Sequence, residues 1–95
     1  MQTSRTKTKI ERFIEVLLLA GQEGIEPRLL GMTIKTNVIN SYAQKLRTFN
    51  VAVKTGQVYA IPNAEDAYTA LKELNRYRVK RGAIPLSSEC LLGWE

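Results

Sequence analysis

The sequence predicts a mainly α-helical domain with one small β-hairpin, and three observations lead to this fold class. Apolar residues recur at spacings of three and four in several stretches, which is the period of a helix with one buried face. The period changes to two only between Val51 and Ile61, as expected for strands. With 95 residues and 44% hydrophobic content, the chain is long enough to bury a core without disulfides or metals.

The first helix is expected to begin after Thr8 and to end at Gly21. Thr8 and Glu11 have the spacing of a capping box, in which each side chain satisfies a backbone amide of the first turn. The apolar stripe of this helix widens toward its C-terminal half, which should therefore form the middle of the core. The stripe comprises Ile10, Phe13, Ile14, Leu17 and Leu18.

A short second helix is expected from Pro27 through Leu30, with a stop near Gly31, because proline is favoured at the first helical position. A third helix should follow over residues 36–49. A long helix, a short helix, a tight turn and an amphipathic helix are the order of a helix-turn-helix unit. The stripe expected to be buried on the third helix is Val38, Ile39, Tyr42, Ala43, Leu46 and Phe49.

After Asn50, which can adopt the left-handed conformation that ends a helix, we expect a hairpin of two short strands. Its turn is Thr55 to Gln57, and Pro62 should stop the second strand. The last helix should be capped by Asn63. Its final turns carry four cations, which either complement the helix dipole or contact phosphate. These cations are Arg76, Arg78, Lys80 and Arg81.

The chain is therefore expected to divide into a flexible basic arm (1–7), a core (8–62), a C-terminal helix of the same domain (63–82) and an apolar tail (83–95). The tail is too apolar to stay in water, so it should pack either on its own domain or on a partner.

Charge is unevenly distributed along the chain. The net charge is +5, yet residues 27–64 contain five basic residues and no acid. Seven of the nine acids lie in two flanking stretches, 11–26 and 65–73. A solvated basic surface is the simpler interpretation, but a surface that faces a polyanion fits this block better. The five basic residues of the block are Arg28, Lys35, Lys45, Arg47 and Lys54.

Composition argues against several function classes. Cys90 is the only cysteine and there is no histidine, so metal, disulfide and triad chemistry have few candidate residues. We therefore expect no enzyme activity and no cofactor. The longest apolar run is far shorter than the roughly 20 residues that span a bilayer, and the N-terminus lacks the features of a secretory signal. We expect a cytoplasmic protein.

The outward face of the third helix is unusual, because it carries amides, a hydroxyl and cations but no acid. An ordinary surface helix alternates glutamate with lysine. Asparagine and glutamine can pair with adenine through two hydrogen bonds, and lysine and arginine can contact guanine or phosphate. We therefore expect this helix to contact nucleic acid. The outward residues are Asn37, Asn40, Ser41, Gln44, Lys45 and Arg47.

The order of elements resembles the winged helix-turn-helix superfamily over residues 8–61. The third helix and hairpin look like those of many bacterial and phage regulators, with Thr36, Val38, Tyr42, Leu46 and Arg47 followed by Tyr59 and Ile61. In that superfamily the third helix enters the major groove and the hairpin lies over the adjacent backbone or minor groove. The resemblance places Thr36, Asn37, Asn40, Ser41 and Gln44 at base-reading positions. It places Lys45, Arg47, Lys54 and Gln57 at phosphate contacts, to which the positive block would add Arg28 and Lys35.

Two functions from different classes follow. The first is a sequence-specific protein that binds double-stranded DNA, such as a small transcriptional regulator of phage, plasmid or mobile-element type. The second is a winged-helix module that docks a protein. We further expect a symmetric homodimer through the last helix or the tail, since one recognition helix reads few base pairs. Folding of the tail onto its own domain would hide the same apolar surface.

Overall fold

Four α-helices, two 3-10 turns and an extended segment make up residues 7–94, which are the residues that the structure, a computed structural model, describes. The mainly helical fold class is confirmed. The expected basic arm lies outside the described residues, except for Lys7. The elements are α1 (Lys9–Ala20), η1 (Gly21–Glu23), α2 (Pro27–Ile34), α3 (Ile39–Thr48), α4 (Ala64–Lys80) and η2 (Ser88–Leu91).

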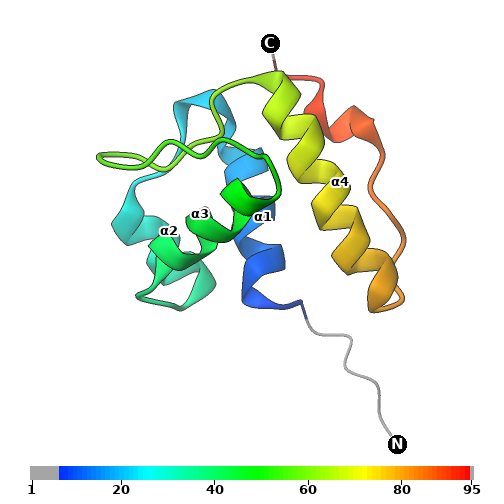
Figure 1. Cartoon of the computed structure of the whole chain (residues 1–95), viewed down its shortest axis with the longest axis horizontal. Coiled ribbons are helices and arrows are strands. Elements are labelled where there is room, and N and C mark those ends of the chain that lie inside the picture. Colours follow the sequence, from blue (N-terminus) through cyan, green and yellow to red (C-terminus); the bar gives the residue numbers. More distant parts are fainter. Residues whose placement is uncertain (1–6, 95) are drawn as a thin grey trace, which may run out of the picture.

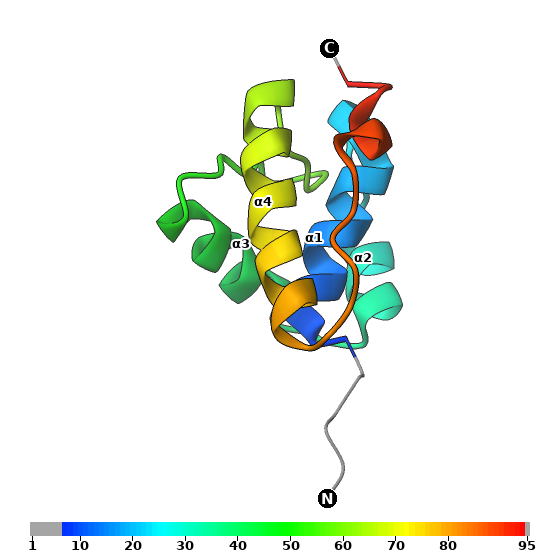
Figure 2. The ribbon, with the colours of Figure 1, turned by 90° about the vertical axis from the view of Figure 1, so that its right-hand side faces the viewer.

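Helix α1 is the centre of the fold and contacts each of the other three α-helices (Figures 1 and 2). Its side chains Phe13, Ile14 and Leu17 are fully buried, as the apolar stripe predicts. The hydroxyl of Thr8 accepts a hydrogen bond from the Glu11 amide at 3.3 Å, so the expected N-cap is confirmed. Glu11 does not complete the expected capping box, because its carboxylate accepts hydrogen bonds from Arg81 instead.

Helix α2 is longer than expected, since it continues through Gly31 to Ile34. Gly31 does not end the helix. Because it has no side chain, it lets the backbone of the following turn approach α2 closely. A Cβ at this position would lie 2.8 Å from the carbonyl oxygen of Thr36. The Thr36 amide also donates to the Gly31 carbonyl at 2.9 Å. The chain reverses at Lys35, whose φ of 59° is left-handed, and the turn into α3 therefore packs directly on α2.

Helix α3 begins at Ile39, three residues later than expected, with Val38 as its N-cap. Val38 is 50% exposed, so its expected place in the buried stripe is wrong. The physical reason is its backbone conformation, with φ −116° and ψ 44°, which lies outside the helical repeat. The rest of the stripe packs as expected, because Ala43 and Leu46 are fully buried.

The segment 51–61 folds back on itself, but the described residues contain no strand. It forms two isolated antiparallel bridges, Lys54 with Ala60 and Ile25 with Tyr59. Two backbone groups that a longer ladder would use have other partners. The carbonyl of Val53 accepts a hydrogen bond from Arg47 at 2.8 Å, and the amide of Ala52 donates to Asp66 at 3.2 Å.

Helix α4 is capped by Asn63, whose side chain accepts from the Asp66 amide at 2.9 Å. The tail then runs back along α4 (Figure 2), so the alternative of packing on its own domain is the one observed. Its Leu91 is buried, and Trp94 packs against the core. Within residues 7–94, no helix combines the length and the apolar character needed to cross a membrane.

Candidate nucleic-acid interface

The inner face of α3 fixes the orientation of its outer face. Ala43 and Leu46 are fully buried, and the ring of Tyr42 lies 5.8 Å from that of Phe13 on α1. Because side chains three and four apart share one face of a helix, this packing turns the polar residues outward. The side chains of Asn37, Asn40, Ser41, Gln44, Lys45 and Thr48 are all exposed.

These exposed positions form one continuous stripe of amides, hydroxyls and a cation, which begins one residue before the N-cap. The structure thus brings together four of the five expected base-reading residues, Asn37, Asn40, Ser41 and Gln44. Thr36 is different, since it is half-buried and its hydroxyl accepts a hydrogen bond from the Val38 amide at 3.2 Å. Its hydroxyl therefore organises the start of α3.

The expected phosphate contacts fall into two groups. Lys45 on α3 and Lys54 and Gln57 on the 51–61 segment have exposed side chains. Arg47 is also exposed, but its guanidinium donates to the Val53 carbonyl and joins the end of α3 to that segment. A guanidinium has five N–H donors, so this bond leaves others available to a ligand.

Sequence reasoning missed Lys9, which has a structural role at the turn before α3. Its ammonium donates to the carbonyl oxygen of Lys35 at 2.9 Å, and Lys35 is the residue at which the chain reverses. The contact joins residues 26 positions apart, so no local pattern could have indicated it. It also places a further cation beside the turn that leads into α3.

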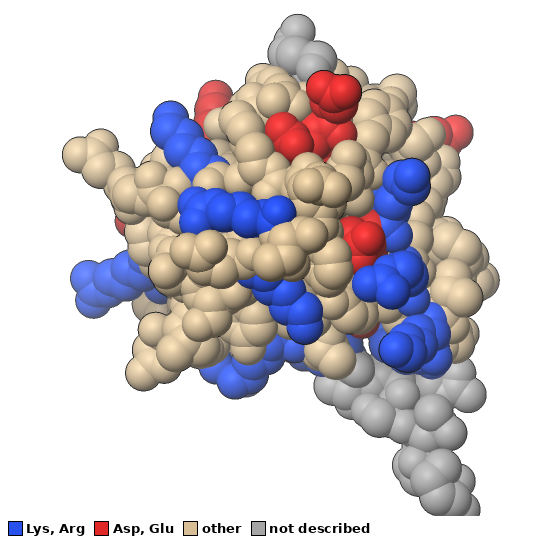
Figure 3. Space-filling model, in the orientation of Figure 1, with Lys and Arg blue, Asp and Glu red and all other residues tan. Residues whose placement is uncertain are grey.

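The electrostatics of this surface follow from where the acids are. Within the part of the chain that the structure describes, the ion pairs involve Lys7, Arg76, Arg78 and Arg81. None of the five cations of residues 27–64 has an acidic partner there, and all five are exposed. Figure 3 shows Lys and Arg spread over α3 and the 51–61 segment, while Asp and Glu gather toward the upper edge of the same face.

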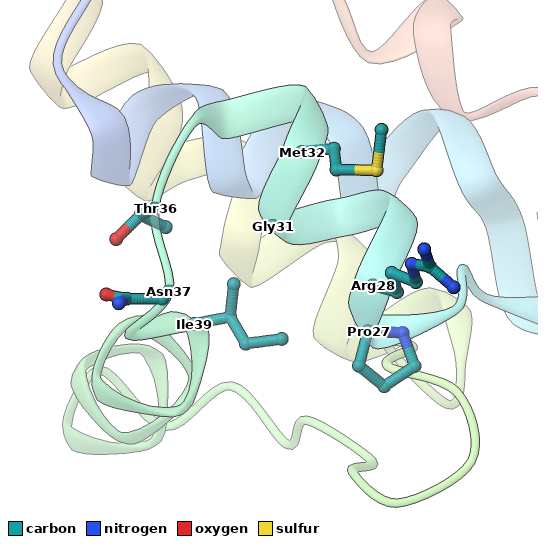
Figure 4. A pocket seen from close by; sticks show the side chains of 7 residues that line it. All are labelled: Pro27, Arg28, Gly31, Met32, Thr36, Asn37 and Ile39. Atoms are coloured by element: carbon teal, nitrogen blue, oxygen red, sulfur yellow. The ribbon is translucent and has the colours of Figure 1, made fainter.

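A hollow of about 400 Å³ separates α2 from the start of α3. Figure 4 shows Ile39 pointing across it toward α2, whereas Thr36 and Asn37 point away from α2. Arg28 lines the far side, so it does not belong to the stripe on α3. The α2 side of this region also carries exposed aliphatic side chains, with Leu29 52% and Met32 67% exposed.

Residues 7–94 contain no group of three or more His, Cys, Asp or Glu side chains that could hold a metal ion. Comparisons of the chain with protein-family models, with curated proteins and with solved structures found no match.

Proposed function

We propose that the protein binds double-stranded DNA sequence-specifically through α3, as a small cytoplasmic transcriptional regulator of phage, plasmid or mobile-element type. The observation that carries the proposal is the acid-free outer face of α3, together with the exposed cations Lys45, Arg47 and Lys54, which have no acidic partner among residues 7–94. A polyanion is the ligand class that such a surface attracts most strongly. The proposed role is binding, without catalysis or a cofactor.

We propose a winged helix-turn-helix arrangement for this binding. Its support is the tight packing of the α2–α3 turn at Gly31 and the return of the 51–61 segment through the Lys54–Ala60 bridge. The second bridge, between Ile25 and Tyr59, holds the base of that segment against the start of α2. The segment would then act as the wing, with Lys54 and Gln57 near its tip.

The chemistry divides between two sets of residues. Amides at Asn40 and Gln44 stand one helical turn apart on the exposed face, where each can form two hydrogen bonds to an adenine edge. Lys45 and Lys54 are exposed cations that can neutralise phosphates and fix the register of the duplex. Asn37 and Ser41 would add contacts at the start of α3.

We also propose that the protein forms a homodimer, but through fewer apolar residues than the sequence suggests. The apolar residues that suggest it are largely covered within one chain, since Leu71, Leu74 and Leu91 are buried. Leu92 and Ile84 are still 83% and 79% exposed on the tail. A dimer would double the length of DNA that is read. Sedimentation of the full chain at tens of micromolar tests it: a dimer mass supports the proposal, and a monomer mass contradicts it.

A second candidate function is docking of a partner protein. The observation that favours it is the group of exposed aliphatic side chains beside α3, namely Leu29, Met32 and Val38. Exposed apolar patches often mark sites of protein–protein interaction. They lie next to the polar stripe rather than within it, so DNA binding remains the function that the stripe supports best.

The experiment that tests DNA binding is a fluorescence titration of a random-sequence duplex at several salt concentrations. If the five cations of residues 27–64 neutralise about five phosphates, they contribute about −4 to −5 to the slope of log K against log salt. Lys54→Ala should reduce the magnitude of the slope by about one unit, whereas Lys54→Arg should keep it. No binding at low salt, or a flat slope, would reject the proposal.

A further inference from the structure

The basic cluster at the end of α4 divides into two groups with different environments. Arg81 forms a charge-assisted pair with the buried Glu11 at 2.7 Å, and Arg78 approaches Glu15 at 3.7 Å and donates to the Ile84 carbonyl. These two arginines therefore hold α4 to α1 and to the tail. They complement structural acids and carbonyls, and neither needs an external ligand.

The remaining cations of α4 face outward. Lys72, Arg76 and Lys80 are spaced by four residues, so they lie along one side of the helix. All three are exposed, and neither lysine forms an ion pair with any residue of the described range 7–94. Arg76 is only partly neutralised, since it pairs with Glu73 at 3.0 Å while 63% of its side chain remains exposed.

These three cations line a surface groove of about 650 Å³ between α4 and the start of the tail. Val79 and Pro85 line it together with the cations, and its described lining includes no acid. In Figure 3, Lys and Arg side chains gather at the lower end of α4, on the same face of the molecule as those around α3.

The groove is also physically connected to α3. The guanidinium of Arg76 lies 5.7 Å from the centre of the Phe49 ring, and Phe49 is the residue that caps the end of α3. A cation near an aromatic face is held by the ring quadrupole. The α4 cations thus continue the positive surface from the end of α3, with Glu73 as an acid beside it.

We propose that Lys72, Arg76 and Lys80 form a second phosphate-binding strip, which takes the sugar-phosphate backbone of the duplex that α3 reads. The inference rests on the proposed function, because it extends the same interface across α4. A polynucleotide fits better than an acidic protein, since cations four residues apart, spaced by about 6 Å along the helix, present repeated single charges to a repeating anion. The strip supplies affinity and orientation, and no base recognition.

The test compares the double variants K72Q/K80Q and K72R/K80R with the parent chain in salt titrations of a random-sequence duplex. The glutamine variant should reduce the magnitude of the salt slope by about two units, because each phosphate contact contributes about 0.9. The arginine variant should keep the parent slope. Arg76 stays unchanged, since it also pairs with Glu73 and packs near Phe49. Thermal unfolding of both variants checks that the fold is intact.

A second measurement uses the parent chain alone. Acetylation of lysines followed by mass spectrometry should show Lys72 and Lys80 protected when saturating duplex is present. An unchanged slope in K72Q/K80Q together with unprotected lysines would overturn the strip while leaving DNA binding through α3 intact. Failure of the parent chain to bind any duplex would instead reject the proposed function, so the two failures are distinguishable.

Discussion

Glu11 is the only charged residue that is buried among residues 7–94, with 1% of its surface exposed. Arg81 donates to both of its carboxylate oxygens, from Nε to Oε1 at 3.0 Å and from Nη2 to Oε2 at 2.7 Å. The hydrogen bond to Glu11 and the negative charges of Glu11 and Glu15 hold the pKa of Arg81 above its ordinary value. The guanidinium of Arg81 therefore stays positively charged, and its pair with Glu11 joins the first turn of α1 to the C-terminal end of α4.

Removal of Arg81 should destabilise the fold strongly, because it leaves the Glu11 carboxylate buried without its partner. We expect Arg81→Ala to lower the midpoint of thermal unfolding clearly. Lys80→Ala is the matched control, since it removes an exposed cation of the same helix that forms no ion pair with residues 7–94, and it should change the free energy of unfolding by no more than about 0.5 kcal/mol. Equal effects of the two variants would contradict a structural role for the buried pair.

Asn40 and Gln44 carry the predicted base recognition. Replacement of either residue by alanine should cost about 1–3 kcal/mol of affinity for a selected site, because each loses up to two hydrogen bonds to a base edge. Binding to random duplex should survive in both variants. Competition between a selected site and random duplex measures the difference, and unchanged selectivity in both variants would assign base reading to other residues.

At the scale of elements, the turn between α2 and α3 decides where the candidate interface lies. Gly31 allows the Thr36 carbonyl to approach α2, and Lys9 holds the Lys35 carbonyl from α1. The outer face of α3 is therefore positioned by contacts on its N-terminal side, and by Arg47 at its C-terminal end.

Gly31→Ala tests this turn. Alanine is favoured over glycine inside a helix by about 1 kcal/mol, but here its Cβ would lie 2.8 Å from a backbone oxygen. We expect the clash to dominate, so that the variant is less stable in denaturant unfolding and binds duplex more weakly. Gly93→Ala is the control, because nothing lies within 4 Å of its added Cβ. A stabilised Gly31→Ala variant would contradict the close approach.

Sequence periodicity predicted the α-helices because each has a local signal, such as the caps at Thr8 and Asn63 and the stripe of α1. It also predicted the exposed polar stripe of α3, since that stripe is the complement of the buried one. It failed at Gly31, which has the same local signature whether it ends a helix or accommodates a neighbouring backbone. It also failed to predict the hydrogen bonds of Val53 and Ala52, whose backbone groups bind side chains of α3 and α4 instead of a neighbouring strand.

At the scale of the whole molecule, the tail completes the core. Asn75 on α4 binds the backbone of Leu86 twice, donating to its carbonyl at 2.9 Å and accepting from its amide at 2.7 Å. Arg78 binds the neighbouring Ile84 carbonyl. The apolar composition of the tail does not show which residues of the domain it contacts. The sequence therefore left open whether the tail covers its own domain or a partner.

Asn75→Ala should loosen the tail, because two backbone groups of Leu86 lose their partner at once. We expect a loss of about 1–3 kcal/mol in the free energy of unfolding. Trp94 is the only tryptophan and packs against the core, so its fluorescence should shift to longer wavelength in this variant. Asn40→Ala, an exposed asparagine on α3, is the control and should leave the emission unchanged. An unchanged spectrum in Asn75→Ala would show that other contacts hold the tail.

The most direct test of the central claim, that the outer face of α3 binds duplex DNA, is an NMR titration of the ¹⁵N-labelled chain with a short duplex. The largest amide shifts should fall on residues 37–48 and 54–57, followed by residues 72–80, while the buried part of α1 shifts little. Shifts confined to α2 around Leu29 and Met32, or no shifts at low salt, would contradict the claim.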